Sequence, residues 1–345
     1  MNAIEIGQLS VVLTYNCNLK CKYCFVSDKS LFDTIDFATV RLGVDMWKSF
    51  FSGGKQKLGV LFTGGEPLLN KGLLLSIMDE LEKCYPELQF EFHITTNGTL
   101  LTEDFLRRIV QKNVFLCVSV DGDAKSNEER IVNSKALFDS IEQNIITYAK
   151  SLNKYRFRVR MTITPNNVGR FYDNIGYLVK LGVENIHFSP NYEESWDNNS
   201  FELYFNTWNR LGKFCNEGII LEPFQSFFVN GVNKQGPYEH DCSFLPTITP
   251  NGDVYYCPRY AGKRIEKLGN VNDPKEVLLG FRRLVVLEQG VFDREGFSFI
   301  CPSNYMENKD VIMNFSRFFN VYKQSQQSEL VQLQNDNNKV TPAMI

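Results

Sequence analysis

Apolar and β-branched runs alternate in the first half of the chain with segments whose apolar residues recur at helical spacing. We predict strands at 8–14, 57–63, 90–95, 114–120, 158–163 and 185–189. Helical patterns lie between them, near 36–51, 71–84, 102–112, 135–151 and 168–181. Strands that alternate with helices in this way favour a parallel sheet with crossover helices, so the sequence predicts an α/β fold up to about residue 190.

Polar and turn-forming segments follow the predicted strands. The first strand leads into a cysteine-rich loop, and the second leads into Gly64-Gly65-Glu66-Pro67. The next three strands lead into Thr96-Asn97-Gly98, Asp121-Gly122 and Pro165-Asn166-Asn167. Because ligands of parallel α/β folds bind at the carboxyl ends of the strands, we expect these segments to converge on one site.

Composition excludes several classes of protein. The 345 residues are 43% hydrophobic with a net charge of −3, which gives no basic excess for a nucleic-acid partner. We find no apolar stretch long enough to span a membrane and no secretory signal at the N-terminus, so we expect a cytoplasmic protein. In that compartment the nine cysteines are expected to be thiols or metal ligands, and three histidines are too few for chemistry built on several histidines.

Three cysteines, Cys17, Cys21 and Cys24, stand in a CxxxCxxC pattern directly after the first predicted strand. Three thiolates on one short loop can hold three corners of a metal site or an iron–sulfur cluster and leave the fourth corner open. Structural zinc sites are closed by four ligands, whereas an open corner is typical of a site for chemistry. The alternative is that the three cysteines only pack within the loop.

This loop resembles the cluster loop of the radical S-adenosylmethionine (SAM) enzymes, and the resemblance covers residues 8 to about 190. It implies an open (β/α)6 partial barrel and a [4Fe-4S] cluster on Cys17, Cys21 and Cys24. The open iron would be chelated by the amino and carboxylate groups of SAM. Tyr23, before the third cysteine, and its neighbour Phe25 would contribute to the cradle for adenine.

The resemblance also implies a set of SAM-binding residues beyond the loop. The segment Gly64, Gly65, Glu66 and Pro67 would meet the SAM amino group, since glycines let the backbone approach a ligand and Glu66 or nearby carbonyls can accept from an ammonium. The other residues implied as SAM contacts are Ser119, Arg130, Thr96 and Asn97. A guanidinium such as that of Arg130 suits a carboxylate through two parallel hydrogen bonds. Each assignment has an alternative. Gly64-Gly65-Glu66-Pro67 would be a surface turn, Ser119 a hydroxyl at the end of a strand, and Arg130 a solvated charge on a helix surface.

A second group of cysteines lies in the C-terminal half. Cys242 and Cys257 enclose Asn251-Gly252, which between β-favouring runs predicts a hairpin that returns Cys257 toward Cys242. The spacing resembles the auxiliary-cluster domain called SPASM, or its shorter form, twitch, with Cys301 as a third ligand. The further Cys-rich run of that family is missing, so we expect at most one auxiliary iron–sulfur cluster. Its fourth ligand would be Asp241, His240, another side chain or the substrate; alternatively, the cysteines only pack.

Three cysteines remain outside these two groups. We expect Cys84, on a helix, and Cys117, in the fourth strand, to be buried packing residues. We expect Cys215, at the end of a helix, to be structural; the alternatives are a thiol hydrogen donor and a fourth cluster ligand. The predicted organisation is a radical SAM domain over 1–195, a linker and bridging helix over 196–239, an auxiliary-cluster domain over 240–322 and a polar flexible tail over 323–345.

The resemblance implies an enzyme that cleaves SAM to a 5′-deoxyadenosyl radical and modifies a peptide or protein substrate. A thioether or C–C crosslink in a ribosomally made peptide is the leading prediction. The alternatives are a peptide epimerase, a small-molecule enzyme resembling the molybdopterin-precursor cyclase, and a non-catalytic iron–sulfur or zinc protein. Expected partners are a low-potential electron donor such as flavodoxin or ferredoxin and a separate peptide-recognition protein, because the 16 residues before Cys17 are too few for a fused one.

Overall fold

A single curved sheet organises the molecule. The computed structural model describes residues 7–26, 33–131, 134–222, 224, 245–262 and 267–281. Their sheet has the strand order β10-β9-β8-β1-β2-β3-β4-β5-β6-β7. The strands are β1 (Gln8–Thr14), β2 (Lys57–Gly64), β3 (Gln89–Thr96), β4 (Val114–Ser119), β5 (Phe157–Ile163), β6 (Asn185–Pro190), β7 (Ile220–Glu222), β8 (Thr247–Ile248), β9 (Asp253–Tyr255) and β10 (Lys267–Asn270).

Helices connect the parallel strands. They are α1 (Phe37–Phe50), α2 (Lys71–Cys84), α3 (Glu103–Val110), α4 (Lys135–Ser151), α5 (Phe171–Lys180) and α6 (Asn198–Asn216), with short 3-10 turns η1 (Pro67–Asn70), η2 (Val168–Arg170) and η4 (Pro258–Tyr260). Four helices begin after a residue whose side-chain oxygen accepts a backbone N–H from the first turn, which is the ordinary N-cap. These caps are Asp36, Thr102, Ser134 and Asp197.

The six predicted strands form β1 to β6, paired in parallel and in chain order, so the predicted α/β partial barrel is confirmed. Two further parallel strands extend it. β7 pairs in parallel with β6, and β8 pairs in parallel with β1. Both are three residues long or shorter, which is too short for a periodic pattern to predict.

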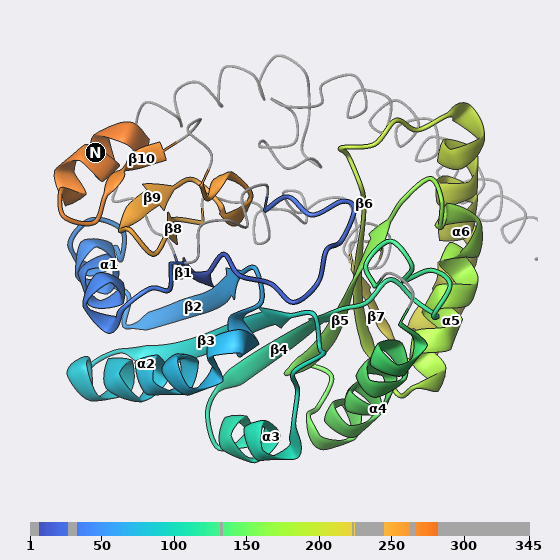
Figure 1. The fold of residues 1–345 in the computed structure, drawn as a ribbon, viewed down its shortest axis with the longest axis horizontal. Helices are drawn as coiled ribbons and strands as arrows, with labels where there is room; N and C mark the ends of the chain where they lie inside the picture. The colour runs from blue at the N-terminus through green and yellow to red at the C-terminus, as the bar shows by residue number, and fades with distance from the viewer. Residues whose placement is uncertain are drawn as a thin grey trace, which may run out of the picture.

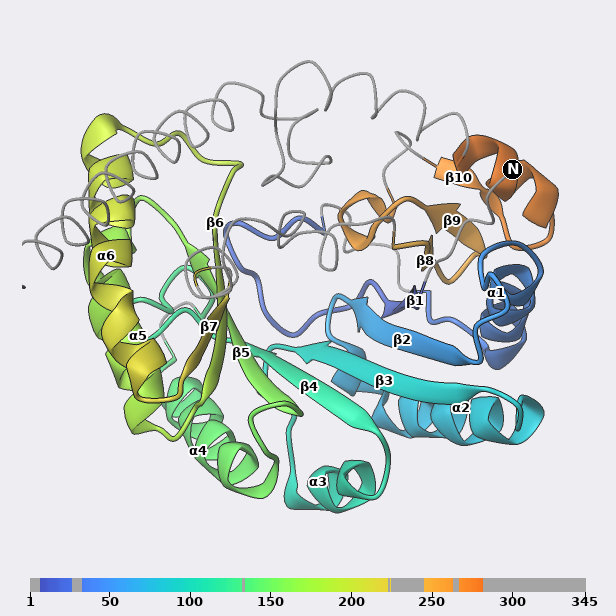
Figure 2. The same ribbon diagram turned by 180° about the vertical axis from the view of Figure 1, so that it is seen from behind.

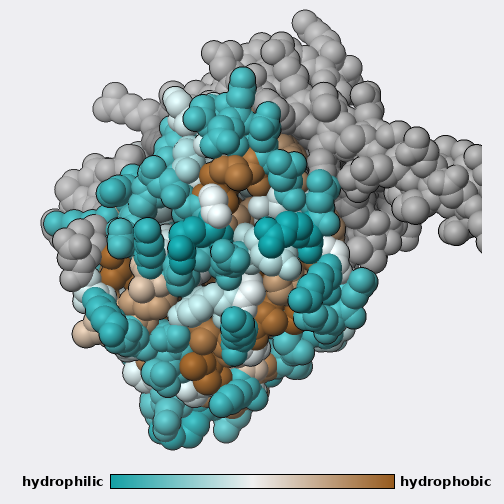
Figure 3. All heavy atoms as spheres, turned by 90° about the vertical axis from the view of Figure 1, so that its right-hand side faces the viewer, coloured by the Kyte–Doolittle hydropathy of each residue, from teal (hydrophilic) through white to brown (hydrophobic). Residues whose placement is uncertain are grey.

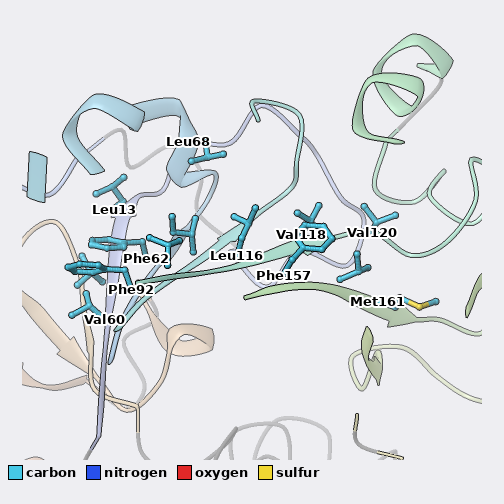
Figure 4. Close-up of a cluster of buried hydrophobic side chains, with 14 of the residues drawn as sticks. Leu13, Val60, Phe62, Leu68, Phe92, Leu116, Val118, Val120, Phe157 and Met161 are labelled. Atoms are coloured by element: carbon cyan, nitrogen blue, oxygen red, sulfur yellow. The ribbon is translucent and has the colours of Figure 1, made fainter. Parts of the chain in front are cut away.

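The sheet bends into an arc with the helices outside it (Figure 1). From behind, α4, α5 and α6 cover the β4–β7 side, while α1 and α2 cover the β1–β3 side (Figure 2). The core lies between sheet and helices, where side chains such as Phe62, Phe92 and Phe157 are buried (Figure 4). Each fully buried side chain of this size contributes about 1.5–3 kcal/mol.

Helix α6 closes the far side of the arc. It begins at Asn198, directly after Asp197, whose side chain caps it. Its aromatic side chains pack inward, where Tyr204 stacks on Phe171 and Trp208 meets Phe188 edge to face. On the outside of this part of the molecule, hydrophobic groups are separated by hydrophilic ones (Figure 3). Among the helices that the structure describes, none is both long and apolar enough to cross a membrane.

The predicted Asn-Gly hairpin is confirmed as the antiparallel pair β8–β9. Gly252 occupies the turn with φ +79, a conformation that glycine adopts without a steric penalty. The hairpin lies against the edge of β1, since Ser10 N donates to Pro246 O at 2.8 Å. The predictions for Asp241, His240, Cys242, Cys301 and the C-terminal tail lie outside the described residues.

Candidate active site

The cysteine loop leaves β1 and crosses the inner side of the arc (Figure 1). Cys17, Cys21 and Cys24 are all half-buried. The far end of the loop is tied across the barrel, because Lys22 N donates to Glu129 O at 2.9 Å, in the segment after β4. The loop therefore stands over the carboxyl ends of the strands, where the sequence placed the site.

The donor set fits an iron–sulfur cluster. Burial raises the pKa of the Cys21 thiol, while the nearby Arg130 guanidinium lowers it. No group of three Cys, His, Asp or Glu side chains within the described ranges is placed to hold a single metal ion. A four-iron cluster is held by one thiolate at each of several irons, so its ligands do not converge on one point.

Gly64 and Gly65 let the second strand end directly against the start of the cysteine loop. Gly65 N donates to Thr14 O at 2.8 Å. A Cβ on Gly65 would lie 2.1 Å from Asn16 O, and Gly64 has φ +129. The sequence predicted that these glycines allow approach to a ligand; the structure shows that they allow approach to the residues just before Cys17.

The Glu66 carboxylate is completely buried and bonded within the protein. Its Oε1 accepts from Leu68 N at 2.9 Å and from Thr96 Oγ1 at 2.7 Å, and its Oε2 accepts from Asn97 N at 2.7 Å. Burial raises the pKa of this carboxyl group, although the three donors oppose that shift. Contact of Glu66 and Thr96 with SAM stays a prediction, and the structure gives their side chains an internal role.

Asn97 lies on the other side of the same carboxylate. Its Nδ2 is 3.8 Å from Cys17 Sγ and 2.9 Å from Asn18 Oδ1. The side chain thus faces the cysteine loop. Its predicted contact with SAM also stays a prediction.

Tyr23 and Arg130 meet through Asp121, which follows β4. The Tyr23 hydroxyl donates to Asp121, and the Arg130 guanidinium lies 5.3 Å from the Tyr23 ring centroid. Arg130 Nη2 donates to Asp121 Oδ1 at 2.9 Å, and the same oxygen accepts from Thr162 N at 2.8 Å. Asp121 is fully buried and Arg130 is 8% exposed. Burial is the largest cause of the raised pKa of Tyr23, and the neighbouring Asp121 adds to it.

Arg130 is therefore not a solvated surface charge. It is buried, and its guanidinium is engaged by a carboxylate of the same chain. Its predicted contact with the SAM carboxylate would have to be shared with Asp121. The sequence indicated Asp121-Gly122 only as the segment that follows the fourth strand, and it did not predict an ion pair for the Asp121 carboxylate.

Ser119 lies on the inner face of the sheet. The register places it beside Arg160, which pairs in turn with His187, and His187 with Glu222. Arg160 is exposed and forms no ion pair within the described part of the chain. The helix-facing side of the same strands is apolar, so the inner face is distinguished by its polar row.

The segment that carries Cys257 reaches the same region. Arg259, in η4, lies 5.7 Å from the ring centroid of Phe25 and pairs with Glu193 at 2.7 Å. Phe25 belongs to the cysteine loop and Glu193 follows β6. Cys257 is half-buried, and the turn that follows it is linked to both sides of the barrel.

The cysteines outside these groups give a mixed outcome. Cys117 is buried, as predicted, and Cys215 is half-buried. The prediction for Cys84 was wrong, because this thiol is exposed. Cys84 is the last residue of α2, and the chain turns there so that Tyr85 takes the buried place.

Comparisons with known proteins show which family and which proteins the chain resembles. Residues 11–191 match the model of the Radical SAM superfamily. The chain is 27% identical to "Uncharacterized protein MJ0907" of Methanocaldococcus jannaschii, over 79% of this chain and 91% of the relative. It is 29% identical to a cysteine-type anaerobic sulfatase-maturating enzyme of Clostridium novyi, over 71% of each. The solved structure of anSMEcpe with bound AdoMet and Kp18Cys peptide has a TM-score of 0.68 at 18% identity, over 92% of this chain and 99% of that one.

Proposed function

The chain belongs to the radical SAM superfamily, and from this premise we propose that it modifies a side chain of a peptide or protein substrate by hydrogen abstraction. Members of the family use SAM and a [4Fe-4S] cluster. The observation that carries the proposal is the similarity to the sulfatase-maturating enzyme, which covers 71% of the chain and so extends beyond the barrel. A thioether or C–C crosslink is the specific modification that we propose to test first.

Cys17, Cys21 and Cys24 would hold the cluster, and the ends of β2 to β5 would surround SAM. When bound, the cluster would supply the electron that splits SAM, and SAM would supply the radical that removes a hydrogen atom from the substrate. The chain's own residues position them. Gly65 brings the end of β2 against the loop at one end, and Asp121 fixes Tyr23 at the other.

The polar inner face supports a peptide as the substrate. Ser119 and Arg160 offer a hydroxyl and a cationic group side by side on the sheet. Peptide backbones and polar side chains need such partners when they leave water. A low-potential electron donor and a separate peptide-recognition protein complete the proposed set of partners.

An auxiliary iron–sulfur cluster on Cys257, Cys242 and Cys301 is a further part of the proposal. It is supported by the position of Cys257 beside η4, whose Arg259 contacts the cysteine loop at Phe25. The Cys257→Ala variant should lose iron but still form 5′-deoxyadenosine without product. Unchanged iron content in this variant would remove Cys257 from the ligand set.

The central test replaces Cys17, Cys21 and Cys24 together with Ala in anaerobically purified protein. Iron should fall by about one four-iron cluster, and 5′-deoxyadenosine formation should stop. Cys84→Ala is the matched control, because this thiol is exposed on α2 and should change neither quantity. SAM cleavage that persists in the triple variant would refute the assignment. Mass spectrometry of a candidate peptide then separates a crosslink, which loses hydrogen, from epimerisation, which leaves the mass unchanged.

A further inference from the structure

The side chain of Asn97 approaches one of the proposed cluster ligands from outside the cysteine loop. Asn97 follows β3 and is 7% exposed, and its Nδ2 lies 3.8 Å from Cys17 Sγ. We propose that Asn97 is a fixed N–H donor to the Cys17 thiolate and that it raises the reduction potential of the cluster. This inference rests on the proposed function, because it requires Cys17 to be a ligand.

The orientation of the Asn97 amide follows from its other end. Its Oδ1 accepts from Thr99 N at 3.0 Å and from Thr99 Oγ1 at 2.7 Å. A backbone N–H can only donate, so the atom that faces it must be the amide oxygen. The amide NH2 group must then face Cys17, and the opposite assignment would set two donors against each other.

A closed ring of hydrogen bonds holds this orientation. Asn97 Nδ2 donates to Asn18 Oδ1 at 2.9 Å, and Asn18 Nδ2 donates to Thr99 Oγ1 at 2.7 Å. The Thr99 hydroxyl donates back to Asn97 Oδ1 and completes the ring. One amide hydrogen of Asn97 is used by Asn18, which leaves the second for Cys17. Chains of hydrogen bonds that run in one direction strengthen one another.

The backbone of Asn97 is fixed as well. Its N–H donates to Glu66 Oε2, and the same carboxylate accepts from the Thr96 hydroxyl. Glu66 N in turn donates to Asn16 O, one residue before Cys17. The donor and the thiolate are therefore parts of one bonded unit, and such outer partners orient and tune the ligands of a metal site.

The sign of the effect follows from charge. Reduction adds an electron to the cluster and increases the negative charge on its sulfur ligands. A hydrogen-bond donor stabilises the more negative state, and hydrogen bonds to the sulfurs are among the factors that set the potential of such clusters. Loss of the Asn97 donor should therefore make the cluster harder to reduce.

The experiment is an anaerobic redox titration of reconstituted protein, followed by electron paramagnetic resonance. The signal that changes when SAM is added identifies this cluster. Asn97→Leu removes the donor and should shift the reduction equilibrium about tenfold against the reduced state, which is about 59 mV for one electron. Asn97→Asp keeps an acceptor toward Thr99 but turns an anionic oxygen to Cys17, so it should lower the potential further.

Asn144→Leu is the matched control. Its Nδ2 donates to Gly98 O at 3.1 Å, next to Asn97 but not toward sulfur, so the potential should not change. Thr99→Val breaks the ring of hydrogen bonds that orients the Asn97 amide, and it should lower the potential by less than Asn97→Leu. If the Asn97→Leu variant holds no cluster, the potential of Thr99→Val tests the inference, and an unchanged potential there would overturn it.

Two failures can be told apart. An unchanged potential in an Asn97→Leu protein with full iron content would overturn this inference and leave the proposed function intact. A cluster that survives in the Cys17, Cys21 and Cys24 triple variant would overturn the proposed function itself. Iron analysis and thermal unfolding of each variant establish that a changed potential does not come from a damaged fold.

Discussion

The two ends of the cysteine loop are held by different chemistry. At the Cys17 end, neutral backbone groups of Gly65 and Glu66 donate to carbonyl oxygens just before the cysteine. At the Tyr23 end, a buried ion pair of Asp121 and Arg130 holds the aromatic ring. One end is a close backbone contact, and the other is a pair of charges removed from water.

The difference teaches where each end is vulnerable. A backbone contact depends on the absence of side-chain atoms, so any added Cβ breaks it. A buried ion pair depends on both partners, because removal of one leaves an uncompensated charge in a low-dielectric site. We therefore expect charge deletion to damage the Tyr23 end most and added volume to damage the Cys17 end most.

The largest effect is expected for Asp121→Ala. It leaves the Arg130 guanidinium buried without its partner, which typically costs about 3–5 kcal/mol. Urea unfolding of the purified protein measures this loss. The double variant Asp121→Leu with Arg130→Met removes both charges and should recover part of the stability, since apolar replacement of a buried pair is often neutral. A double variant less stable than Asp121→Ala would show that charge is not what holds this end.

A somewhat smaller effect is expected for Gly65→Ala. The new Cβ would lie 2.1 Å from Asn16 O and 2.4 Å from Tyr15 O, both backbone atoms that cannot turn aside. Overpacking of this kind costs about 1–3 kcal/mol, and displacement of Asn16 should also lower iron retention. Gly72→Ala is the control, because a Cβ there meets nothing within 4 Å. Equal iron content in both variants would contradict the close-contact interpretation.

Glu66→Gln tests whether the charge of this carboxylate matters at the Cys17 end. Glu66 accepts from two backbone N–H groups and the Thr96 hydroxyl. A Gln amide would turn an NH2 group toward a backbone N–H and leave a buried donor unsatisfied, at a cost of about 1–3 kcal/mol. We expect a lower free energy of unfolding and a weaker hydrogen bond from Asn97 N to residue 66. The second effect is measured as iron lost from the cluster when the protein is diluted. A variant as stable as the parent would show that a neutral acceptor is enough.

Much of the Cys17 end could be predicted from sequence. The strands, the cysteine spacing and the segment Gly64–Pro67 are local patterns, and parallel topology places their ends together. What the sequence did not show is the direction of each side chain. Glu66 was expected to face SAM, yet its oxygens are used by donors from β3 and η1, and such pairings depend on the packed register.

The Tyr23 end was harder to predict. Arg130 and Tyr23 were both predicted to contact SAM, which stays a prediction, and the contacts of both with Asp121 were not predicted. Asp121 and Arg130 are nine residues apart in an irregular segment, where no helical or strand period relates them. A carboxylate that directly follows a buried strand is the one signal that could have indicated a partner.

The smallest effect is expected where the chain leaves the loop and enters α1. Asp36 is exposed and caps this helix, with its Oδ1 accepting from Thr39 N at 2.7 Å. Asp36→Ala should cost about 1 kcal/mol at neutral pH. Hydrogen bonds from Thr39 lower the pKa of Asp36 below its usual value of 3.8. The cap is therefore fully present above that value and is lost as the pH falls through the lowered pKa.

Urea unfolding at pH 7 and near pH 3 checks this prediction, and the difference between Asp36→Ala and the parent should shrink at the lower pH. Asp197→Ala is the matched control, because Asp197 caps α6 through Ser200 N with the same geometry and a similarly lowered pKa. Both variants should lose similar stability. Only Asp36→Ala should also weaken iron retention, because Ile35, beside it, is bonded to β1 at Leu13 O and returns the cysteine loop to the sheet. Equal iron loss in the two variants would mean that the contact of Ile35 with β1 does not help to retain the cluster. The Cys17 end and the Tyr23 end would then be sufficient to hold the cysteine loop.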